Sequence, residues 1–299
     1  MAQHLLGAFD YALDLRDGTL GAASETQTMS EAFRARYGPW ALVAGGSLGM
    51  GAAYSRQLAQ KGLNVFLVAE VAEPLQSLAR SLAAEYGVET RAAVVDLAAP
   101  DMLDQLDAAS RDIEIGLLVY NAAHSVVGRF LDVSLDDKLR MLAVNCRGPL
   151  SLCHHHGARM AARGRGGIIL MASLSGFQGH AMVGTYAATK AFDLVLGEAL
   201  WAELREHGVD TLAFCPGATR TPGFLGSNPR PTRGLAPPLM DAEETVAEAL
   251  AALGRGPTRI AGRANRVAAF VMHRLLPRRV LVELMSRATS AMYDRRSSG

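Results

Sequence analysis

The sequence predicts an α/β protein built on one doubly wound parallel sheet with helices on both faces. From Trp40 onward, short and continuously apolar runs alternate with longer amphipathic runs. Runs that are apolar throughout are typical of strands buried on both faces, and amphipathic runs are typical of helices that cover such a sheet. Right-handed crossovers between parallel strands place these helices on both faces. The 299 residues contain no internal repeat and no evident interdomain linker, so we expect a single domain.

The individual elements follow from the length of each run, since short apolar runs suit strands and longer periodic runs suit helices. Strands are predicted at Trp40–Ala44, Asn64–Ala69, Thr90–Val95, Ile115–Tyr120, Ile168–Ala172, Asp210–Phe214 and Thr258–Ala261. Helices are predicted at Met50–Lys61, Glu73–Tyr86, Asp101–Arg111, Ser134–Ala162, Val183–His207 and Asp241–Leu253.

Three segments stand apart from this alternation. Residues 1–36 are weakly patterned, and we interpret them as an N-terminal extension that packs on the core, exchanges with a partner subunit or is partly mobile. The dinucleotide-binding and catalytic domain is expected to span residues 37–262. Within it, residues 222–240 are rich in proline and glycine, so we expect neither a helix nor an inner strand but a lid over the substrate. Residues 263–299 predict one or two C-terminal amphipathic helices packed on the domain or on a partner subunit, in preference to a helix lying on a membrane surface.

Composition excludes several classes of protein. The chain is 49% hydrophobic and 20% charged with a formal net charge of +1, which gives no general attraction to nucleic acid or to an anionic membrane. No apolar stretch is long enough to span a bilayer, and the N-terminus lacks the pattern of a signal peptide. Three scattered cysteines, Cys146, Cys153 and Cys215, argue against a disulfide framework and favour a cytoplasmic location.

The first predicted strand runs into a glycine-rich turn, Ala44-Gly45-Gly46-Ser47-Leu48-Gly49-Met50-Gly51, that opens a helix. Glycine permits the sharp turn and lets the backbone approach a pyrophosphate, which then rests on the N–H groups of the helix start. We therefore expect a Rossmann-type dinucleotide site. The residues expected to line it here are Gly45, Ser47, Leu48, Gly49, Met50 and Gly51.

The ends of the next strands supply the adenosine side of this site. Glu70 lies 19 residues after Gly51, close to the offset at which an acidic residue binds the ribose hydroxyls. Its carboxylate would repel a 2′-phosphate, and no arginine at Leu48 or Glu70 offsets that charge, so NAD is the expected cofactor and NADP the alternative. Asp96, beside Leu97, is placed to bind the adenine amino group, or else caps the following helix. At the end of the fourth strand, Asn121 and Ala122 are expected to lie against the nucleotide.

Tyr186 and Lys190 place a phenol and an ammonium on one helix face, four residues apart. A nearby positive charge favours the phenolate, as proton exchange near neutral pH requires. Ser173 ends the fifth predicted strand, so its hydroxyl faces the same crevice and can stabilise an alkoxide on the substrate. Asn145 is expected to be buried within a predicted helix, where its amide needs a hydrogen-bond partner. A water bridge to Lys190 would supply that partner.

Together these motifs resemble the short-chain dehydrogenase/reductase (SDR) family over roughly residues 40–262. The resemblance covers Gly45, Gly49 and Gly51 in the dinucleotide loop. It also covers the catalytic tetrad of Asn145, Ser173, Tyr186 and Lys190, and the Pro216-Gly217 turn, with Thr219 and Thr221 where the family contacts the carboxamide and the pyrophosphate. Departures are Ala44 in place of the usual threonine, and Tyr120 and Ala123 at the end of the fourth strand.

A closer resemblance is to the branch with 3-oxoacyl-CoA reductases and 17β-hydroxysteroid dehydrogenases. It rests on Arg36-Tyr37-Gly38-Pro39-Trp40, Gly62-Leu63-Asn64-Val65 and Glu85-Tyr86-Gly87-Val88-Glu89-Thr90. That branch usually has an arginine at the position of Glu70, so its preference for NADPH is not carried over. Its frequent membrane anchors are not expected here.

The family resemblance implies a secondary alcohol dehydrogenase or ketone reductase. In the oxidative direction Tyr186 takes the hydroxyl proton, Ser173 holds the substrate oxygen, Lys190 binds the nicotinamide ribose and Asn145 maintains a proton relay. The resemblance also implies a homodimer or homotetramer formed through the helices predicted at Ser134–Ala162 and Val183–His207. The enzymatic alternative is an NADPH-dependent ketoreductase of 3-oxoacyl or steroid substrates. The non-enzymatic alternative is a dinucleotide-binding sensor or scaffold, against which the complete tetrad argues.

Other residues give weaker indications. Consecutive residues of a helix point in different directions, so His154, His155 and His156 cannot chelate one metal ion and no metal site is expected. His124 and His180 flank the strand ends and either line the substrate pocket or lie at the surface. An apolar substrate is suggested by five residues around the strand ends and the lid, although the same residues also suit packing: Phe177, Met182, Val183, Phe224 and Leu225.

Overall fold

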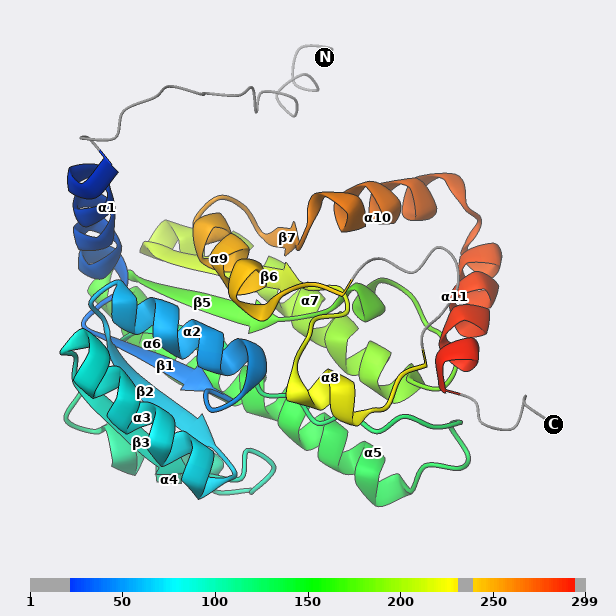
Figure 1. Ribbon diagram of the computed structural model, residues 1–299, viewed down its shortest axis with the longest axis horizontal. Helices are drawn as coiled ribbons and strands as arrows, with labels where there is room; N and C mark the ends of the chain where they lie inside the picture. The colour runs from blue at the N-terminus through cyan, green and yellow to red at the C-terminus, as the bar shows by residue number, and fades with distance from the viewer. Residues whose placement is uncertain (1–21, 231–238, 294–299) are drawn as a thin grey trace, which may run out of the picture.

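The computed structural model describes residues 22–230 and 239–293, and its core is one seven-stranded parallel sheet (Figure 1). The strand order is β3-β2-β1-β4-β5-β6-β7, and every neighbouring pair is parallel. The strands are β1 (Trp40–Ala44), β2 (Asn64–Ala69), β3 (Thr90–Val94), β4 (Ile115–Tyr120), β5 (Gly166–Met171), β6 (Val209–Cys215) and β7 (Thr258–Ile260). The predicted fold class is confirmed. Because strand order reverses between β1 and β4, a crevice opens there at the carboxyl ends of the strands.

Two layers of helices bury the two faces of the sheet. One layer contains α2 (Gly49–Gln60), α3 (Ala72–Tyr86) and α9 (Ala242–Ala252), and the other contains α4 (Met102–Ser110), α6 (Gly148–Arg163) and α7 (Gly184–Leu204). Successive strand residues point to opposite layers: Val43 packs with α2 and α3, whereas Leu42 packs with α4 and α6. This double burial explains why the strand sequences are apolar throughout.

The single helix predicted at Ser134–Ala162 is instead three segments, so that prediction is corrected. They are α5 (Leu135–Leu142), a π-helical turn η1 (Ala143–Arg147) and α6. Pro149 has no N–H, so the carbonyl of Asn145 lacks the donor that a regular helix would supply four residues later. The hydroxyl of Tyr120 donates a hydrogen bond to the Val144 carbonyl at the same point. Both effects favour the wider turn, which sets Asn145 at the site described below.

The lid segment also begins differently from its prediction. Pro222–Gly226 forms a short helix, α8, although this stretch was expected to contain none. The expectation was wrong because Pro222 stands at the start of the helix, where its missing N–H has no partner to lose. Thr221 caps the helix by accepting a hydrogen bond from the N–H of Phe224 at 3.2 Å. Residues 231–238 of the predicted lid lie outside the described residues.

Near the N-terminus, the helix α1 (Ala22–Tyr37) joins the core through its last turns. Phe33 packs against the buried residues beside α2, and Tyr37 is itself buried. The Tyr37 hydroxyl donates a 2.7 Å hydrogen bond to Asp210 on β6, and Arg36 pairs with the same carboxylate at 2.9 Å. Burial and then Asp210 raise the pKa of Tyr37. The C-terminal end of α1 is therefore attached to the catalytic domain by packing and by charge.

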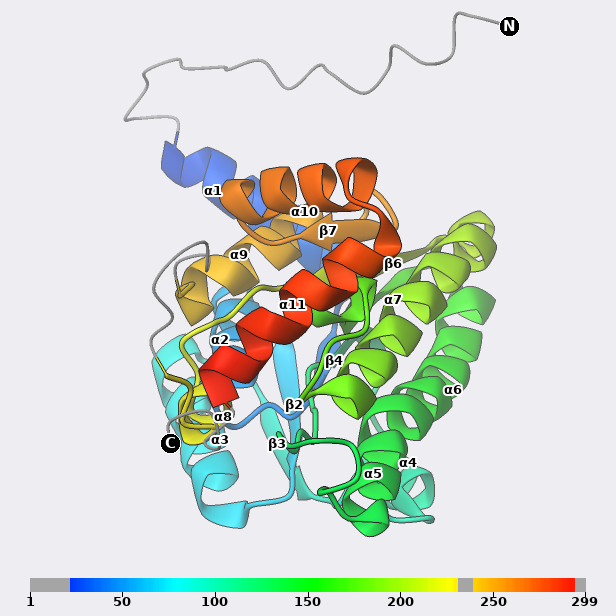
Figure 2. The same ribbon diagram turned by 90° about the vertical axis from the view of Figure 1, so that its right-hand side faces the viewer.

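The C-terminal segment forms two helices, α10 (Arg263–Leu275) and α11 (Arg278–Tyr293). Figure 2 shows α11 crossing the molecule near the loop that follows β5. Thr289 on α11 is hydrogen-bonded to the Nδ1 atom of His180 at 2.8 Å, and Ser286 accepts a hydrogen bond from the N–H of Ala181 at 3.1 Å. His180 is thus buried against α11 rather than lying at the surface, and burial lowers its pKa.

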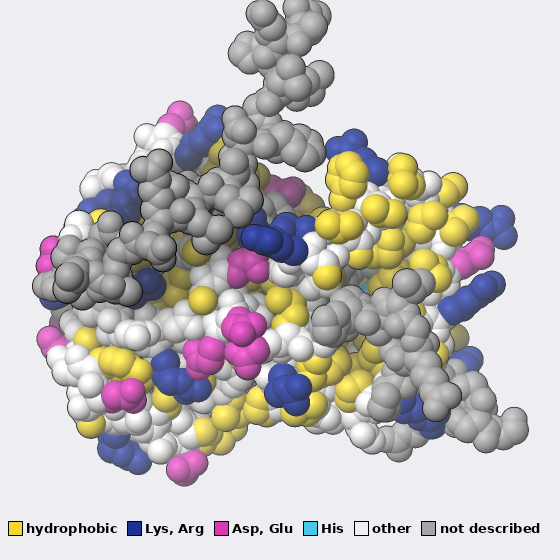
Figure 3. Space-filling model, turned by 45° about the horizontal axis from the view of Figure 1, so that its top comes forward, with side chains coloured by type: hydrophobic (Ala, Val, Ile, Leu, Met, Phe, Trp, Pro, Cys, Tyr) yellow, Lys and Arg dark blue, Asp and Glu magenta, His cyan; other side chains and the backbone are white. Residues whose placement is uncertain are grey.

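The outer face of α10 is apolar and exposed. Figure 3 shows hydrophobic side chains gathered over this helix. Val267, Phe270, Val271 and Leu275 are between 44% and 71% exposed, while Asn265 and Ala269 face inward. Association of this segment with a partner subunit remains a prediction. In the described part of the chain, no helix has the length and apolar character needed to cross a membrane.

His156 makes the stability of the fold sensitive to acid. Burial, followed by the nearby charges of His155 and Arg159, lowers its pKa from 6.5 to about 3. The unfolded chain binds this proton first, so the associated stability is present above the unfolded pKa and is lost as the pH falls from 6.5 toward the folded pKa. We expect His156 to lower the free energy of unfolding by up to about 1.4 kcal/mol per pH unit over that range. Urea denaturation of the wild type and His156→Leu at several pH values measures this slope.

The exposed neighbour His154 provides the matched control. His154→Leu should leave the pH dependence of unfolding unchanged. An equal slope in the wild type and in His156→Leu would show that other groups cause the acid sensitivity.

Candidate active site

The glycine-rich turn lies at the crevice between β1 and β4 and leads into α2. Gly45 has φ of +76°, and a Cβ atom there would be 2.7 Å from the Cα of Ala122. At Gly51 a Cβ atom would lie only 1.8 Å from the carbonyl oxygen of Gly45. Asn121 fastens the turn by donating from its side-chain amide to the same carbonyl at 2.9 Å. Only glycine therefore fits this tight approach of strand, turn and helix.

The start of α2 is open to an anion. Its N-cap residue Leu48 makes no side-chain capping bond and is 52% exposed, and no acidic residue occupies the first turn. The N–H groups there have the positive end of the helix dipole behind them. A pyrophosphate fits this start, so the residues present suit a dinucleotide. Ser47 and Met50 flank Leu48 in the same turn.

The segment after β6 reaches this turn from the other side. A Cβ atom at Gly49 would lie 3.0 Å from the side chain of Thr221, so these two predicted cofactor residues are neighbours. Thr219 is buried and its hydroxyl donates to the carbonyl of Gly217 at 3.1 Å. The carbonyl of Pro216 accepts a hydrogen bond from Leu174, next to Ser173, at 3.1 Å. The structure therefore brings the Pro216-Gly217 turn beside the strand end that holds Ser173.

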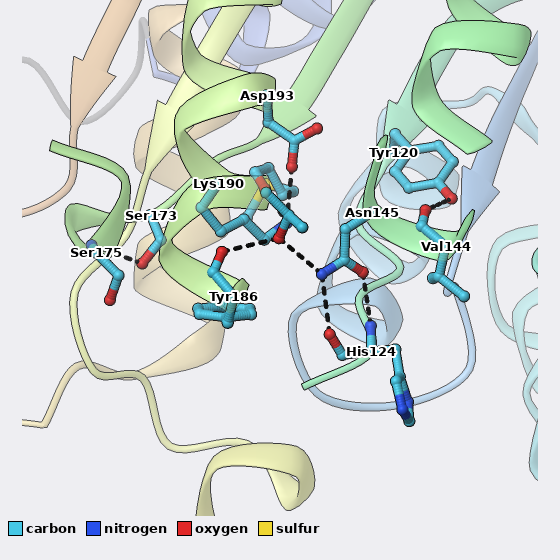
Figure 4. Close-up of polar contacts among 11 residues, drawn as sticks. Tyr120, His124, Val144, Asn145, Ser173, Ser175, Tyr186, Lys190 and Asp193 are labelled. Carbon is cyan, nitrogen blue, oxygen red and sulfur yellow. Dashed lines mark hydrogen bonds and ion pairs between the residues drawn. The ribbon is translucent and has the colours of Figure 1, made fainter. Parts of the chain in front are cut away.

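Figure 4 shows Ser173 and Asn145 on either side of Tyr186 and Lys190. Ser173 directly precedes the turn Leu174–Phe177, and its hydroxyl accepts a hydrogen bond from the N–H of Ser175 at 3.1 Å. Tyr186 stands in the first turn of α7 and is partly exposed, as a residue that meets a substrate must be. Close packing holds the two segments together, because a Cβ atom at Gly176 would lie 2.7 Å from the backbone of Lys190.

Asn145 is fully buried, and its amide joins the loop after β4 to α7. Its nitrogen donates to the His124 carbonyl at 2.9 Å and to the Thr189 hydroxyl at 3.0 Å, and its oxygen accepts from the His124 N–H at 2.8 Å. His124 thus contributes its backbone to this brace. Protein groups already supply the hydrogen-bond partners of this amide. A proton relay from Asn145 to Lys190 through water therefore stays a prediction.

Lys190 is buried and forms an ion pair with Asp193, which was not predicted from the sequence. Its Nζ atom lies 2.9 Å from Asp193 Oδ2 and 2.6 Å from the Met171 carbonyl oxygen. It also lies 5.9 Å from the centre of the Tyr186 ring. Burial alone lowers the pKa of Lys190, but Asp193 and Tyr186 outweigh burial and raise it, so the ammonium stays charged. Asp193 follows Lys190 by three residues on one helix, and this spacing was the sequence signal that could have indicated the ion pair.

A small hollow lies beside the first residues of α7. It lies between the loop after β4 and the start of α7, and its lining residues are Val126, Gly128, Phe130, Val133, Lys138, Met141, Met182, Val183, Gly184 and Thr185. Met182 has φ of +69°, a strained conformation for a side chain of this kind, and its carbonyl accepts a hydrogen bond from Gly128. Of the five residues that suggested an apolar substrate, Met182 and Val183 line this hollow, Phe177 packs on His273, and Phe224 and Leu225 lie in α8.

At the adenosine side, the structure places an arginine that was not predicted from the sequence. Arg140 on α5 pairs with Glu70 at 3.0 Å and with Asp96 at 3.0 Å. The sequence has no arginine at Leu48 or Glu70, as noted above, but Arg140 reaches the same place from α5. Asp96 also accepts a hydrogen bond from the N–H of Ala98 at 2.8 Å, so it caps the turn after β3 rather than the helix α4.

The same contacts explain the ionisation of Asp96. Burial raises its pKa, but the N–H of Ala98 and the guanidinium of Arg140 outweigh burial and lower it. Asp96 therefore remains an acceptor over the physiological range. Leu97 beside it is buried in the core.

The three consecutive histidines diverge. His154 is exposed, His155 lies 3.0 Å from Asp107 and His156 points into the core. Within residues 22–230 and 239–293, no three histidine, cysteine or acidic side chains are grouped so that they could hold a metal ion.

This arrangement has counterparts among known proteins. A family model described as short chain dehydrogenase matches residues 39–230. A 7beta-hydroxysteroid dehydrogenase from Clostridium sardiniense is 32% identical over 234 residues, which cover 78% of this chain and 89% of that protein. A very-long-chain 3-oxoacyl-CoA reductase from Podospora anserina is 33% identical over 178 residues, which cover 58% of this chain and 52% of that protein.

The solved structures agree with these sequence matches. One solved structure comes from work on the stereoselectivity of a 7beta-hydroxysteroid dehydrogenase. It superposes on this chain with a TM-score of 0.79 at 31% sequence identity. It covers 84% of this chain and 98% of that chain. The resemblance predicted from the motifs is thereby confirmed.

The Lys190–Asp193 pair should make a large contribution to folding stability. Asp193→Leu leaves a buried ammonium without its counter-charge, so we expect the free energy of unfolding to fall by about 3–5 kcal/mol. Adding Lys190→Met replaces the pair by apolar groups of similar volume and should recover most of that loss. Chemical denaturation near neutral pH measures both effects.

Asp107, which pairs with Arg159 at the surface, supplies the control. Asp107→Leu should change the free energy of unfolding by no more than about 1 kcal/mol. A double variant no more stable than Asp193→Leu would mean that the lost stability has another source than the uncompensated ammonium.

Proposed function

The chain belongs to the short-chain dehydrogenase family, and on that premise we propose that Tyr186, Ser173 and Lys190 interconvert a secondary alcohol and a ketone on an apolar substrate, with NAD as the preferred cofactor. The oxidoreductase class itself follows from the family: the chain acts on CH–OH groups with a nicotinamide dinucleotide. One observation supports the roles of the residues above all others. Ser173 and Tyr186 come together at the end of β5 beside a charged, buried lysine.

The proposed roles follow from the position and chemistry of each group. A nicotinamide dinucleotide, when bound, supplies the hydride acceptor or donor. The phenolate oxygen of Tyr186 takes the proton from the alcohol in oxidation, and the Tyr186 hydroxyl returns it to the ketone oxygen in reduction. Lys190 holds a fixed positive charge 5.9 Å from the centre of the Tyr186 ring. Ser173 donates a hydrogen bond to the substrate oxygen, and Asn145 keeps the loop after β4 against α7.

The dinucleotide is proposed to lie from the crevice to the end of β3. Gly45, Gly49 and Gly51 leave room for the pyrophosphate, and Thr221 borders it. Asn121 shapes the turn and Ala122 offers a small surface to the nucleotide. Glu70 would accept hydrogen bonds from the ribose hydroxyls and repel a 2′-phosphate, which favours NAD.

An apolar substrate is suggested by the character of the side chains around the small hollow beside the start of α7. Met182, Val183 and Met141 give it apolar walls, and Lys138 is its one charged lining residue. Two relatives are named for a 7beta-hydroxysteroid and for a very-long-chain 3-oxoacyl-CoA. The specific substrate class we propose is therefore a bulky alicyclic or long-chain secondary alcohol or its ketone.

Two alternatives differ from this proposal in testable ways. A NADPH-dependent ketoreductase of steroid or 3-oxoacyl groups is favoured by Arg140, which places a positive charge beside Glu70. A sensor or scaffold without catalysis has no need for a buried ammonium next to a partly exposed phenol, so the Lys190 site argues against it. Three cysteines without disulfides support our proposal of a cytoplasmic location.

We also propose that the protein forms a homodimer or homotetramer through α5, α6 and α7. Leucines on α5 and α6 are exposed without a partner in one chain: Leu135 is 68%, Leu139 51%, Leu142 44% and Leu150 48% exposed. Val195 on α7 is 63% exposed. Exposed apolar side chains of this size are typical of an interface.

Replacement of the proposed proton-transfer residue tests the mechanism. With NAD and a panel of bulky secondary alcohols, we expect Tyr186→Phe to lower kcat by on the order of 10²–10⁴-fold, because the hydroxyl that exchanges the proton is lost. Its affinity for NAD should change little. Nicotinamide absorbance measures turnover, and fluorescence titration measures binding.

Tyr86, at the C-terminal end of α3, is the matched control. Tyr86→Phe removes a hydroxyl from an element that carries no residue of the tetrad and should keep most of the activity. Turnover in Tyr186→Phe equal to that of the wild type would exclude Tyr186 as the proton-transfer residue.

A charge in the exposed apolar surface tests the proposed assembly. Leu139→Arg should shift the protein to a smaller species, because an arginine buried without a partner is costly at an interface. Light scattering after size-exclusion chromatography measures the mass. A monomeric wild type, or an unchanged mass in Leu139→Arg, would contradict an interface at α5.

A further inference from the structure

We propose that Arg140 is a specificity residue that lets this site accept a 2′-phosphate, and that Glu70 restrains it. Three elements meet at the adenosine end: Glu70 follows β2, Asp96 follows β3 and Arg140 lies in α5. The inference rests on the proposed placement of the dinucleotide and adds to it how the site distinguishes NAD from NADP.

The two carboxylates hold Arg140 unequally. Asp96 accepts from both terminal nitrogens of the guanidinium, at 3.0 and 3.2 Å, and the Ala98 N–H fixes Asp96 in turn. Glu70 accepts a single hydrogen bond, at 3.0 Å, and its side chain is 66% exposed. Asp96 therefore anchors the arginine beside the nucleotide site, while Glu70 makes the weaker contact that a competing anion can displace.

The charges explain why the outcome depends on both residues. Two carboxylates and one guanidinium leave the trio with a net negative charge, which disfavours a phosphate while Glu70 is ionised. Loss of Glu70 frees the guanidinium N–H that now bonds it, and this charged donor can then meet a 2′-phosphate while Asp96 keeps Arg140 in place. Ribose hydroxyls need only an acceptor, which the second oxygen of Glu70 provides. The trio as it stands favours NAD, and loss of Glu70 should turn it toward NADP.

Among the described residues, Arg147 is a second cation close to Asp96. One of its terminal nitrogens donates to the backbone carbonyls of Ala98 and Ala99 and to no carboxylate that an anion could displace. It adds positive charge near the turn after β3, and its pairing would not change with Glu70. Arg140 is therefore the cation whose availability Glu70 controls.

A double-mutant cycle tests this coupling through binding alone. The dissociation constants of NAD⁺ and NADP⁺ are measured by calorimetry for the full-length wild type, Glu70→Gln, Arg140→Gln and the double variant. We expect Glu70→Gln to tighten NADP⁺ binding by on the order of tenfold, because the like charge is lost and the guanidinium is freed. In the Arg140→Gln background the same change should tighten it by no more than about twofold.

Further variants separate charge, shape and place. Arg140→Lys keeps the charge without the fork and should retain only part of the gain from Glu70→Gln. Arg159→Gln removes an arginine that pairs with Asp107 away from this site, and it should leave both dissociation constants unchanged. Circular dichroism confirms that each variant is folded.

The outcomes separate this inference from the proposed cofactor preference. An equal gain in NADP⁺ affinity with and without Arg140, or no gain in Glu70→Gln, overturns the role of Arg140. Glu70→Gln is also measured in an Arg147→Gln background. If the gain in NADP⁺ affinity is lost there although Arg140 is intact, the role belongs to Arg147 and the proposal for Arg140 is overturned. A wild type that binds NADP⁺ more tightly than NAD⁺ refutes the proposed preference for NAD, yet a gain that depends on Arg140 would still support the coupling.

Discussion

Lys190 keeps a positive charge inside the protein, and much of the polar structure at the carboxyl ends of the strands accommodates it. Removing an ion from water costs several kcal/mol, so such a charge persists only with good partners. Asp193 supplies the counter-charge and the Met171 carbonyl a further acceptor. Both partners lie away from the solvent, which leaves the Tyr186 side of the ammonium to act on the phenol. The ion pair is thus part of the fold and also the electrostatic basis of the proposed chemistry.

A break in helical regularity provides the opposite wall of the site. Tyr120 bonds the Val144 carbonyl, and Pro149 cannot donate to Asn145, so the chain takes a π-helical turn at that point. The turn is stabilised by Asn145 itself, whose amide is bonded on three sides by His124 and Thr189. Irregular backbone of this kind often marks functional sites. Here it fixes the loop after β4, which lines one side of the small hollow beside the start of α7.

The two ends of the dinucleotide site follow different physical rules. At the pyrophosphate end, close backbone packing around Gly45 and Gly51 leaves no alternative to glycine. At the adenosine end, exposed charged side chains from three elements balance one another, and a single substitution can shift that balance. The first end is therefore fixed by backbone packing, whereas the second depends on a balance of side-chain charges.

The sequence by itself determined the strands β1, β2 and β4 to the residue, the glycine turn, and the placing of Ser173 and Tyr186 at one edge of the sheet. These features depend on local patterns: buried strands are apolar throughout, and parallel strands end at the same edge. Only the tertiary structure decided the partners of the charges and the breaks in the helices. Arg140 pairs with Glu70, which is 70 residues away in the chain, and the Tyr120 hydroxyl at the end of β4 bonds the Val144 carbonyl in the π-helical turn. Such contacts depend on how elements pack in space, which spacing along the chain does not record.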